Sequence, residues 1–297
     1  MTVVERPRAL ADQIRPEPSF GKRVGHYVRR HPGGVLGSTL VLLIVLIAIF
    51  ANQIAGQDPT ALNPAERLAG PSAAHRFGTD NFGRDLFSRT VHGTRISLGV
   101  GFGVSLAALL GGIIFGLLAG YYRRLDAPLM RLMDAVMAFP GIILAIGIVA
   151  ATGQSIANVI LALGVVYIPR VARLVRSVVL SVREQAFIEA ARAIGVRDWR
   201  LLGRHILPSS WSPIIVQGTF VFAEGVLGEA TLSFLGVGPP PIYPSWGTIL
   251  SEARPFIREA PWMMILPGIA LTVTVLSLNL MGDGLRDLLD PRLRRRA

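Results

Sequence analysis

The sequence predicts an all-α polytopic membrane protein with six transmembrane helices, and three observations lead to this prediction. Of the 297 residues, 51% are hydrophobic and only 16% are charged, whereas soluble domains carry about 25% charged residues. The charged residues are concentrated between six long apolar runs, and about 20 apolar residues suffice to cross a bilayer. Cysteine is absent, which excludes disulfides, thiolate nucleophiles, iron–sulfur clusters and cysteine-ligated zinc.

Each apolar run is interpreted as one crossing. The first covers residues 35–55 and carries no charge; some thirty residues precede it and no small-residue cleavage site follows closely, so a removable signal peptide is not expected. The fourth is short, and Pro169 and Arg170 blur its end. Six crossings place both termini on the same side. The five later runs are residues 96–122, 135–152, 156–168, 211–235 and 262–281.

The distribution of basic residues predicts the orientation. Of the 30 arginines and lysines, 23 lie before the first run, after the second, after the fourth or after the sixth. The positive-inside rule therefore places both termini and the 170–210 loop in the cytoplasm. This explains the net charge of +11 by topology, so nucleic-acid binding is not expected. The predicted parts are a cytoplasmic tail (1–32), a first helix with an extracytoplasmic loop (33–95), a core of five helices (96–281) and a cytoplasmic tail (282–297).

Residues for chemistry are scarce. Lys22 is the only lysine and lies outside any phosphate-binding loop, so this chain is not expected to hydrolyse ATP by that route. The five histidines have no metal-ligand spacing, and no serine lies in a nucleophile elbow. No arginine or lysine is expected deep in a span, which argues against a charge-paired proton relay. We therefore predict a chain without catalytic residues, metal site or cofactor of its own.

The second run carries a stripe of small residues. Gly99 and Gly103, then Gly112, Gly116 and Gly120, recur every four residues along one helical face. Small residues let helices approach closely in lipid. The stripe predicts a helix-packing face.

Two acids lie in the fifth run, Glu224 and Glu229. A carboxylate in the bilayer centre costs about 2.5–3.5 kcal/mol on insertion scales, so polar groups or water must face each of them. Five residues apart, they project about 140° from each other on a helix and are not expected to share a partner. They are either hydrogen-bonded between helices or near a span end, or at least one lines a translocation pathway.

The loop after the fourth run predicts two short amphipathic helices. Residues 186–194 are rich in helix formers, with Phe187, Ala190 and Ile194 at helical spacing, and Gly195 supplies a left-handed helix end. Asp198 is expected to cap a second helix that carries Trp199, Leu202 and Ile206 and ends near Pro208. Two such helices cannot bury both faces alone. They fit either a groove of another protein or the membrane surface, and we favour the former.

This loop resembles the EAA signature of permease subunits in bacterial ABC importers, which is Glu-Ala-Ala, three residues, Gly, nine residues and Ile-x-Leu-Pro. His205 stands where the signature has isoleucine, as in the peptide-importer branch. The matching residues are Glu189, Ala190, Ala191, Gly195, Leu207 and Pro208.

Three further segments resemble the C-type permease of oligopeptide, dipeptide and nickel importers. They are FGTDNFGRDLFSRTVHGTRISLGVG (77–101), EATLSFLGVG (229–238) followed by PSWG (244–247), and GDGLRDLLDPRLR. The resemblance covers nearly everything from Gly33 onward. Glu229 falls within the family pattern, whereas Glu224 does not obviously do so.

The resemblance implies a permease subunit of an ATP-driven importer in the cytoplasmic membrane, with peptides as the expected substrate. Its implied partners are a B-type permease, two ATP-binding subunits that hold ATP and Mg²⁺, and an extracytoplasmic binding protein. Residues 189–208, with Asp198 and Trp199, would form the coupling element seated in the ATPase. A nickel or other small-solute importer, or an ATP-independent secondary transporter, is the alternative.

Four charged residues stand out in the loop between the first two runs, namely Asp80, Arg84, Asp85 and Arg89. They predict either a solvated, internally paired cluster that holds the loop together, or a docking platform for the binding protein.

Overall fold

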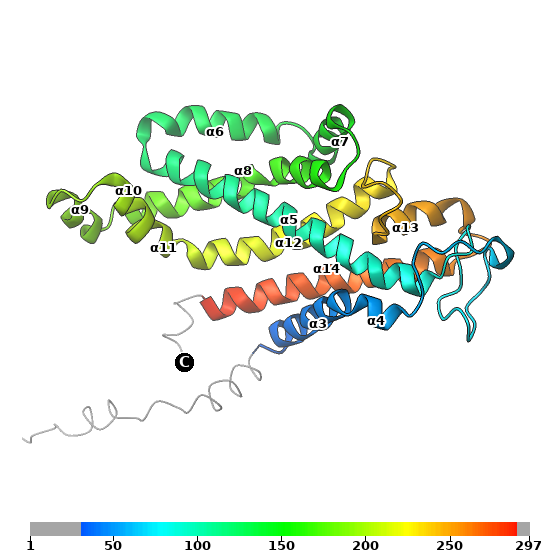
Figure 1. Ribbon diagram of the computed structural model, residues 1–297. Helices are drawn as coiled ribbons and strands as arrows, with labels where there is room; N and C mark the ends of the chain where they lie inside the picture. The colour runs from blue at the N-terminus through cyan, green and yellow to red at the C-terminus, as the bar shows by residue number, and fades with distance from the viewer. Residues whose placement is uncertain (1–30, 290–297) are drawn as a thin grey trace, which may run out of the picture.

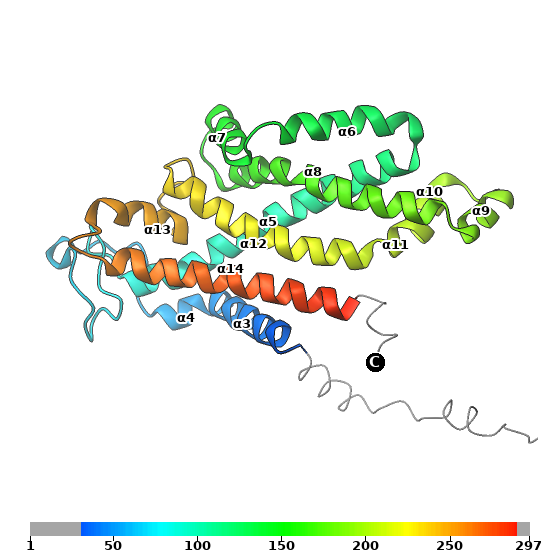
Figure 2. The same cartoon turned by 180° about the vertical axis from the view of Figure 1, so that it is seen from behind.

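The computed structural model describes residues 31–289, which form an elongated bundle of α-helices (Figures 1 and 2). Within this range β-pairing is limited to one isolated bridge, between Thr79 and Asp85. The all-α prediction is confirmed. The longer helices are α3 (Pro32–Ile49), α5 (Leu86–Tyr121), α6 (Arg123–Met137), α7 (Gly141–Thr152), α8 (Ile156–Arg183), α12 (Trp211–Phe234) and α14 (Trp262–Leu289). The shorter elements are α4 (Ala51–Ala55), η2 (Pro64–Glu66), α9 (Ala186–Ala193), α10 (Asp198–Leu201), η3 (Leu202–Ile206), α11 (Leu207–Ser209), α13 (Trp246–Ala253) and η4 (Arg254–Phe256).

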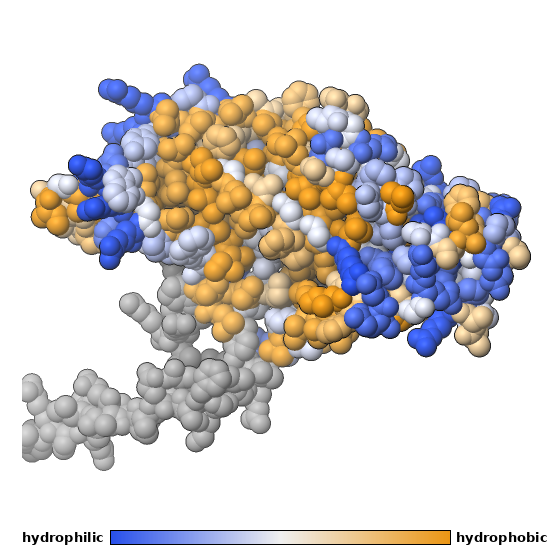
Figure 3. All heavy atoms as spheres, in the orientation of Figure 1, coloured by the Kyte–Doolittle hydropathy of each residue, from blue (hydrophilic) through white to orange (hydrophobic). Residues whose placement is uncertain are grey.

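Four of these helices, α3, α5, α8 and α14, are each long and apolar enough to cross a membrane. Two bent pairs, α6 with α7 and residues 198–209 with α12, raise the number to six if each pair is one crossing. Figure 3 shows a broad hydrophobic zone in the middle of the molecule and hydrophilic residues gathered at both ends. The described residues therefore hold four to six candidate crossings, and the expected six is the upper value.

The third predicted span, residues 135–152, is not one straight helix. α6 ends at Met137, α7 begins at Gly141, and the two meet at 89°. Pro140 stands at the break, and a proline pushes the residue before it out of the helical region. α6 is amphipathic and α7 has 12 residues, so neither matches the predicted crossing on its own.

Two helices are longer than the hydropathy pattern predicts. α5 begins ten residues before the predicted span, at Leu86, because the Asp85 side chain accepts a hydrogen bond from the backbone N–H of Ser88 (2.7 Å) and caps the helix there. α8 continues through Pro169 to Arg183. Packing against α5 outweighs the hydrogen bond that the proline removes. Arg89 and Arg170, both expected in loops, therefore lie on membrane-length helices.

The predicted glycine stripe packs α5 against α8. A Cβ added at Gly116 would lie 2.6 Å from Cβ of Val175, and one added at Gly120 would lie 2.6 Å from Cβ of Val179. Gly112 faces Val171 in the same way, whereas Gly99 has no neighbour within 4 Å. The prediction of a packing face is thus confirmed for the later glycines and wrong for Gly99.

The two ends of the described chain lie together. Nδ1 of His31, just before α3, is 2.9 Å from a carboxylate oxygen of Asp287 near the end of α14. The 56–85 loop and α13 occupy the opposite end of the bundle (Figure 1). The first predicted span is interrupted at Phe50 between α3 and α4, and residues 282–289, assigned to a tail, continue α14. The remaining tail residues, 1–30 and 290–297, lie outside the described range.

Candidate functional site

The segment from α9 to α11 (residues 186–209) forms the end of the bundle opposite the 56–85 loop (Figure 1). α9 matches the first predicted helix within one residue. Gly195 has φ +81°, which is the left-handed conformation expected of it. The second helix is a composite of α10, a π-helical turn and α11, and it continues one residue beyond Pro208. Leu207 and Pro208 form the start of α11, and α12 then leaves at 65° to the preceding helices.

The α9–α11 segment is anchored on one side and open on the other. Ile188, Leu201 and Ile206 are fully buried and pack into the core that α8 contributes. Large apolar side chains on the outer side are exposed: Ile194 is 82% exposed and Trp199 is 63% exposed. Glu189 and Ala190 are exposed and Ala191 is half-buried. The segment is thus a firmly held element that presents apolar surface.

Asp198 does not cap the second helix as predicted. It is the first helical residue, and Arg197 holds the cap position without a side-chain hydrogen bond. The Asp198 carboxylate instead accepts a hydrogen bond from the hydroxyl of Tyr121 (2.6 Å), and the guanidinium of Arg192 lies 5.2 Å from the centre of the Tyr121 ring. Asp198 therefore joins the segment to the end of α5.

Asp80 and Arg84 of the 56–85 loop form a buried cluster with Arg89 of α5 and Glu252 of α13. Arg84 contacts Asp80 (2.6 Å) and Glu252 of α13 (2.6 Å), and Arg89 contacts the same two carboxylates. Asp80 is 1% exposed and Arg89 is 2% exposed. The first of the two predictions was a solvated, internally paired cluster. The pairing is confirmed, but the cluster is buried, so the expectation that it is solvated is wrong.

His75 lies beside this cluster, between two carboxylates. Its Nδ1 is 2.8 Å from Asp85 and its Nε2 is 3.0 Å from Glu66. The hydrogen bond with Asp85 raises the pKa of His75 above its ordinary value, and the contact with Glu66 acts in the same direction. When it is protonated, His75 ties η2 to the start of α5 through these two carboxylates.

Glu229 lies in a buried hydrogen-bond network. Its carboxylate accepts hydrogen bonds from the hydroxyls of Ser233 (2.7 Å), Ser245 (2.7 Å) and Ser97 (3.3 Å). Ser245 caps α13, and Ser97 of α5 accepts a hydrogen bond from the backbone N–H of Trp246 (3.1 Å). Glu229 has no exposed surface. It thus links α5, α12 and α13, which fits a carboxylate hydrogen-bonded between helices.

Glu224 contacts a different group, as its projection from the helix predicts. It forms an ion pair with Arg170 near the middle of α8. The Arg170 side chain is 54% exposed and that of Glu224 is 36% exposed. The expectation that no basic residue lies deep in a span is wrong, because α8 continues well beyond the apolar run and Arg170 lies near the middle of this candidate crossing.

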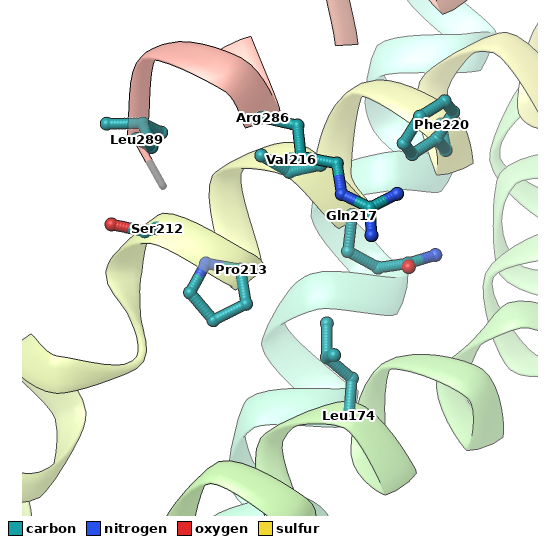
Figure 4. Close-up of a pocket in the computed structure, with 8 residues that line it drawn as sticks. All are labelled: Leu174, Ser212, Pro213, Val216, Gln217, Phe220, Arg286 and Leu289. Carbon is teal, nitrogen blue, oxygen red and sulfur yellow. The ribbon is translucent and has the colours of Figure 1, made fainter. Parts of the chain in front are cut away.

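A cavity of about 410 Å³ lies between α8, α12 and the end of α14. Figure 4 shows Gln217 and Arg286 among the residues that line it. Within residues 31–289, no group of three or more histidines, aspartates or glutamates could hold a metal ion.

Sequence reasoning missed several residues of these networks, namely Arg170, His75, Glu252, Ser97 and Ser245. The apolar repeat Val171, Val175 and Val179 follows Arg170 at helical spacing and could have shown that the helix continues. The other contacts join residues far apart in the chain, and no local pattern predicts them.

The chain resembles known proteins over most of its length. Residues 112–295 match the family of binding-protein-dependent transport system inner membrane components, and residues 19–71 match the N-terminal transmembrane domain of oligopeptide transport permease C. A putative peptide transport system permease from Brucella abortus is 49% identical over 93% of this chain and 95% of its own. A dipeptide transport system permease from Alkalihalophilus pseudofirmus is 46% identical over 90% of this chain and 88% of its own.

A glutathione transport system permease from Escherichia coli is 44% identical over 97% of this chain and 95% of its own. Among solved structures, the methionine ABC transporter MetNI in an inward-facing conformation matches with a TM-score of 0.56 and 19% identity. That match covers 68% of this chain and 96% of the other, and it supports the fold alone. The family match spans well over half of the chain and the relatives match nearly all of it. This chain therefore belongs to the family of binding-protein-dependent transport system inner membrane components.

Proposed function

We propose that this chain is the permease component of an ABC importer for dipeptides and oligopeptides, and specifically its C-type subunit. The observation that carries the proposal is similarity over nearly the whole chain to permeases described as peptide, dipeptide and glutathione transporters, at 44–49% identity. Glutathione is itself a peptide, so all three descriptions agree in substrate class. No relative reported above supports the nickel alternative, and membership of the binding-protein-dependent family does not favour an ATP-independent transporter.

The proposed assembly contains four kinds of chain besides lipid. A B-type permease pairs with this one, two ATP-binding subunits bind ATP and Mg²⁺, and an extracytoplasmic binding protein delivers the peptide. The membrane is the bacterial cytoplasmic membrane, with the α9–α11 segment and both chain ends on the cytoplasmic side. The excess of arginine at that end of the bundle supports this orientation. This chain itself performs no catalysis in the proposal.

We propose the α9–α11 segment as the coupling element, with Glu189, Ala190, Ala191, Gly195, Asp198, Trp199, Leu207 and Pro208 as its residues. Exposed Ile194 and Trp199 beside charged neighbours are typical of a helix that fills a groove in a partner. The buried anchors Ile188 and Leu201 support a rigid connection to α8. Movement of the ATP-binding subunits would reach the long helices through this connection.

The proposed docking platform for the binding protein is the surface of the 56–85 loop together with α13. Asp80, Arg84, Asp85 and Arg89 have little exposed surface. Their role in the proposal is therefore to hold the platform in shape rather than to touch the binding protein.

Gly195→Leu tests the coupling proposal. A side chain in the left-handed region costs about 1–2 kcal/mol, and the strain falls on the turn between α9 and α10. Gly147→Leu is the matched control, because Gly147 lies in α7, outside the proposed coupling element, with ordinary φ and open space around it. We expect Gly195→Leu to lose peptide-stimulated ATP hydrolysis in the purified transporter while its subunits still copurify. Wild-type stimulation in Gly195→Leu would refute the coupling role.

Reconstituted vesicles test the function as a whole. The complete transporter with its binding protein should accumulate a labelled dipeptide only when ATP is present. Excess unlabelled peptide should compete for uptake, and Ni²⁺ should not. Uptake that continues without ATP, or uptake of Ni²⁺ in place of peptide, would overturn the proposal.

A further inference from the structure

We propose that Arg170 and Glu224 form a peptide-binding pair within the membrane, in which Arg170 binds the substrate's terminal carboxylate and Glu224 its terminal ammonium group. The inference rests on the proposed function, because it names how a peptide importer would recognise its substrate inside the membrane. It begins from an ion pair on the surface of this subunit that joins the middle of α8 to the middle of α12.

The pair lies near the middle of α8 and α12, both of which belong to the candidate membrane crossings. Arg170 is 54% exposed and Glu224 is 36% exposed, and charged groups at the centre of a bilayer are costly unless protein or water faces them. The face of α8 and α12 that carries this pair is therefore turned toward water or another protein chain. A peptide crossing the membrane needs such a polar route, since its own charges avoid lipid for the same reason.

The pair leaves charge available for a ligand. Arg170 binds Glu224 through Nη1, and the guanidinium fork can bind a carboxylate through further N–H groups. Oε2 of Glu224 is buried and has no hydrogen-bond partner among the described residues. The hydroxyl of Tyr167 donates to the backbone carbonyl of Glu224 (3.3 Å) rather than to its side chain. An ammonium group that displaces Arg170 would thus meet a carboxylate with no competing donor.

Peptides match the pair in charge. A dipeptide or oligopeptide with free ends carries one ammonium and one carboxylate group. In the empty transporter Arg170 and Glu224 neutralise each other; when a peptide arrives, each side chain exchanges its partner for one peptide terminus. The exchange buries no uncompensated charge, which makes it inexpensive in a region of low dielectric.

The two side chains also stand on different helices, since α8 leads into the α9–α11 segment and α12 leaves it. A shift of α12 relative to α8 would therefore separate Arg170 from Glu224. With α8 and α12 in this second arrangement, Arg170 and Glu224 would each hold one end of the peptide. When the helices return and the ion pair between Arg170 and Glu224 forms again, the peptide would be released.

Blocked peptides test the assignment. The purified transporter with its binding protein is supplied with a dipeptide that is free, N-acetylated or C-amidated, each at saturation of the binding protein. We expect Glu224→Gln to slow uptake of the free and amidated peptides by about tenfold or more, with the N-acetylated peptide unaffected. Arg170→Gln should slow the free and acetylated peptides and spare the amidated one. Arg173→Gln is the matched control, because Arg173 lies one turn along α8 and pairs with Asp134 instead.

A second measurement is needed for any blocked peptide that the binding protein does not bind, because uptake cannot then be measured. Saturation-transfer NMR of the same peptides with the transporter alone should show contact with the ammonium end lost in Glu224→Gln and contact with the carboxylate end lost in Arg170→Gln. If either variant slows all three peptides equally, or slows none, the assignment is wrong. If the wild-type transporter moves no peptide at all, the proposed function fails instead.

Discussion

Glu229 illustrates how a single carboxylate can hold three helices in register. Its partners Ser97, Ser233 and Ser245 come from α5, α12 and the start of α13, and all four side chains are buried. Such a network stabilises the fold only while every polar group in it has a hydrogen-bond partner. A buried polar group that loses its partner costs more free energy than the hydrogen bond contributed. The position of α13 over the bundle therefore depends on the carboxylate.

Glu229→Ala should lower the free energy of unfolding by about 2–4 kcal/mol, because three buried hydroxyls lose their acceptor. Thermal unfolding in detergent measures the loss, and hydrogen exchange should show the amides of α13 opening first. Thr231→Ala is the control: Thr231 is half-buried and bonds only to a carbonyl of its own helix, that of Leu227. If Glu229→Ala unfolds like Thr231→Ala, the network has no stabilising role.

His75 makes the 56–85 loop sensitive to pH. Its pKa is raised in the folded protein by Asp85 and Glu66, above the unfolded value of about 6.5. The protonated side chain therefore stabilises the loop fully below that value, and the contribution is lost as pH rises through the raised pKa. Proteolysis of the loop should accelerate over this range in the wild-type protein.

His75→Gln should abolish that pH dependence and leave the loop at its less protected level throughout. His92→Gln is the control, since His92 contacts Ser88 and Asn52 and not the two carboxylates. A loop whose cleavage rate follows pH equally in His75→Gln would show that another group is responsible.

At the scale of elements, the pairing of α5 with α8 depends on backbone approach. A Cβ at Gly116 would lie 2.6 Å from Cβ of Val175 and 2.7 Å from the carbonyl oxygen of Ala172. We expect Gly116→Ala to destabilise the protein by about 1–3 kcal/mol, because the helices must separate. Gly99→Ala, in the same helix with nothing within 4 Å, should be neutral or stabilising through its helix propensity of about 1 kcal/mol. Thermal unfolding measures the stability of both variants. Equal stability of Gly116→Ala and Gly99→Ala would contradict the packing argument.

The helices were predictable from the sequence to the extent that hydropathy governs them. The predicted fifth span agrees with α12 within one residue, because apolar residues occupy most of its length. α5 and α8 exceed their predicted spans since a cap at Asp85 and packing around Val175 extend helices through polar residues. The break between α6 and α7 was missed although Pro140 marks it, because an average of hydropathy over residues 135–152 does not register a proline.

At the scale of the whole molecule, the local form of the α9–α11 segment was predictable and the charge networks were not. The left-handed conformation of Gly195 was predictable because glycine adopts it more readily than other residues. Arg170, in contrast, contacts Glu224 only after α8 and α12 have packed. The same holds for Arg89 and Glu252, which are separated by most of the chain. Local patterns predict elements, and long-range ion pairs depend on the assembled bundle.

The proposed orientation of the molecule rests on its charge, and it can be tested cleanly because the chain contains no cysteine. Ala73→Cys introduces a thiol on the exposed 56–85 loop, and Ala193→Cys introduces one on the exposed end of α9. The excess of arginine beside α9 should hold that end in the cytoplasm. An impermeant maleimide should therefore label Ala73→Cys in intact cells and Ala193→Cys only after permeabilisation. The reverse pattern would invert the molecule and remove the coupling role of the α9–α11 segment with it.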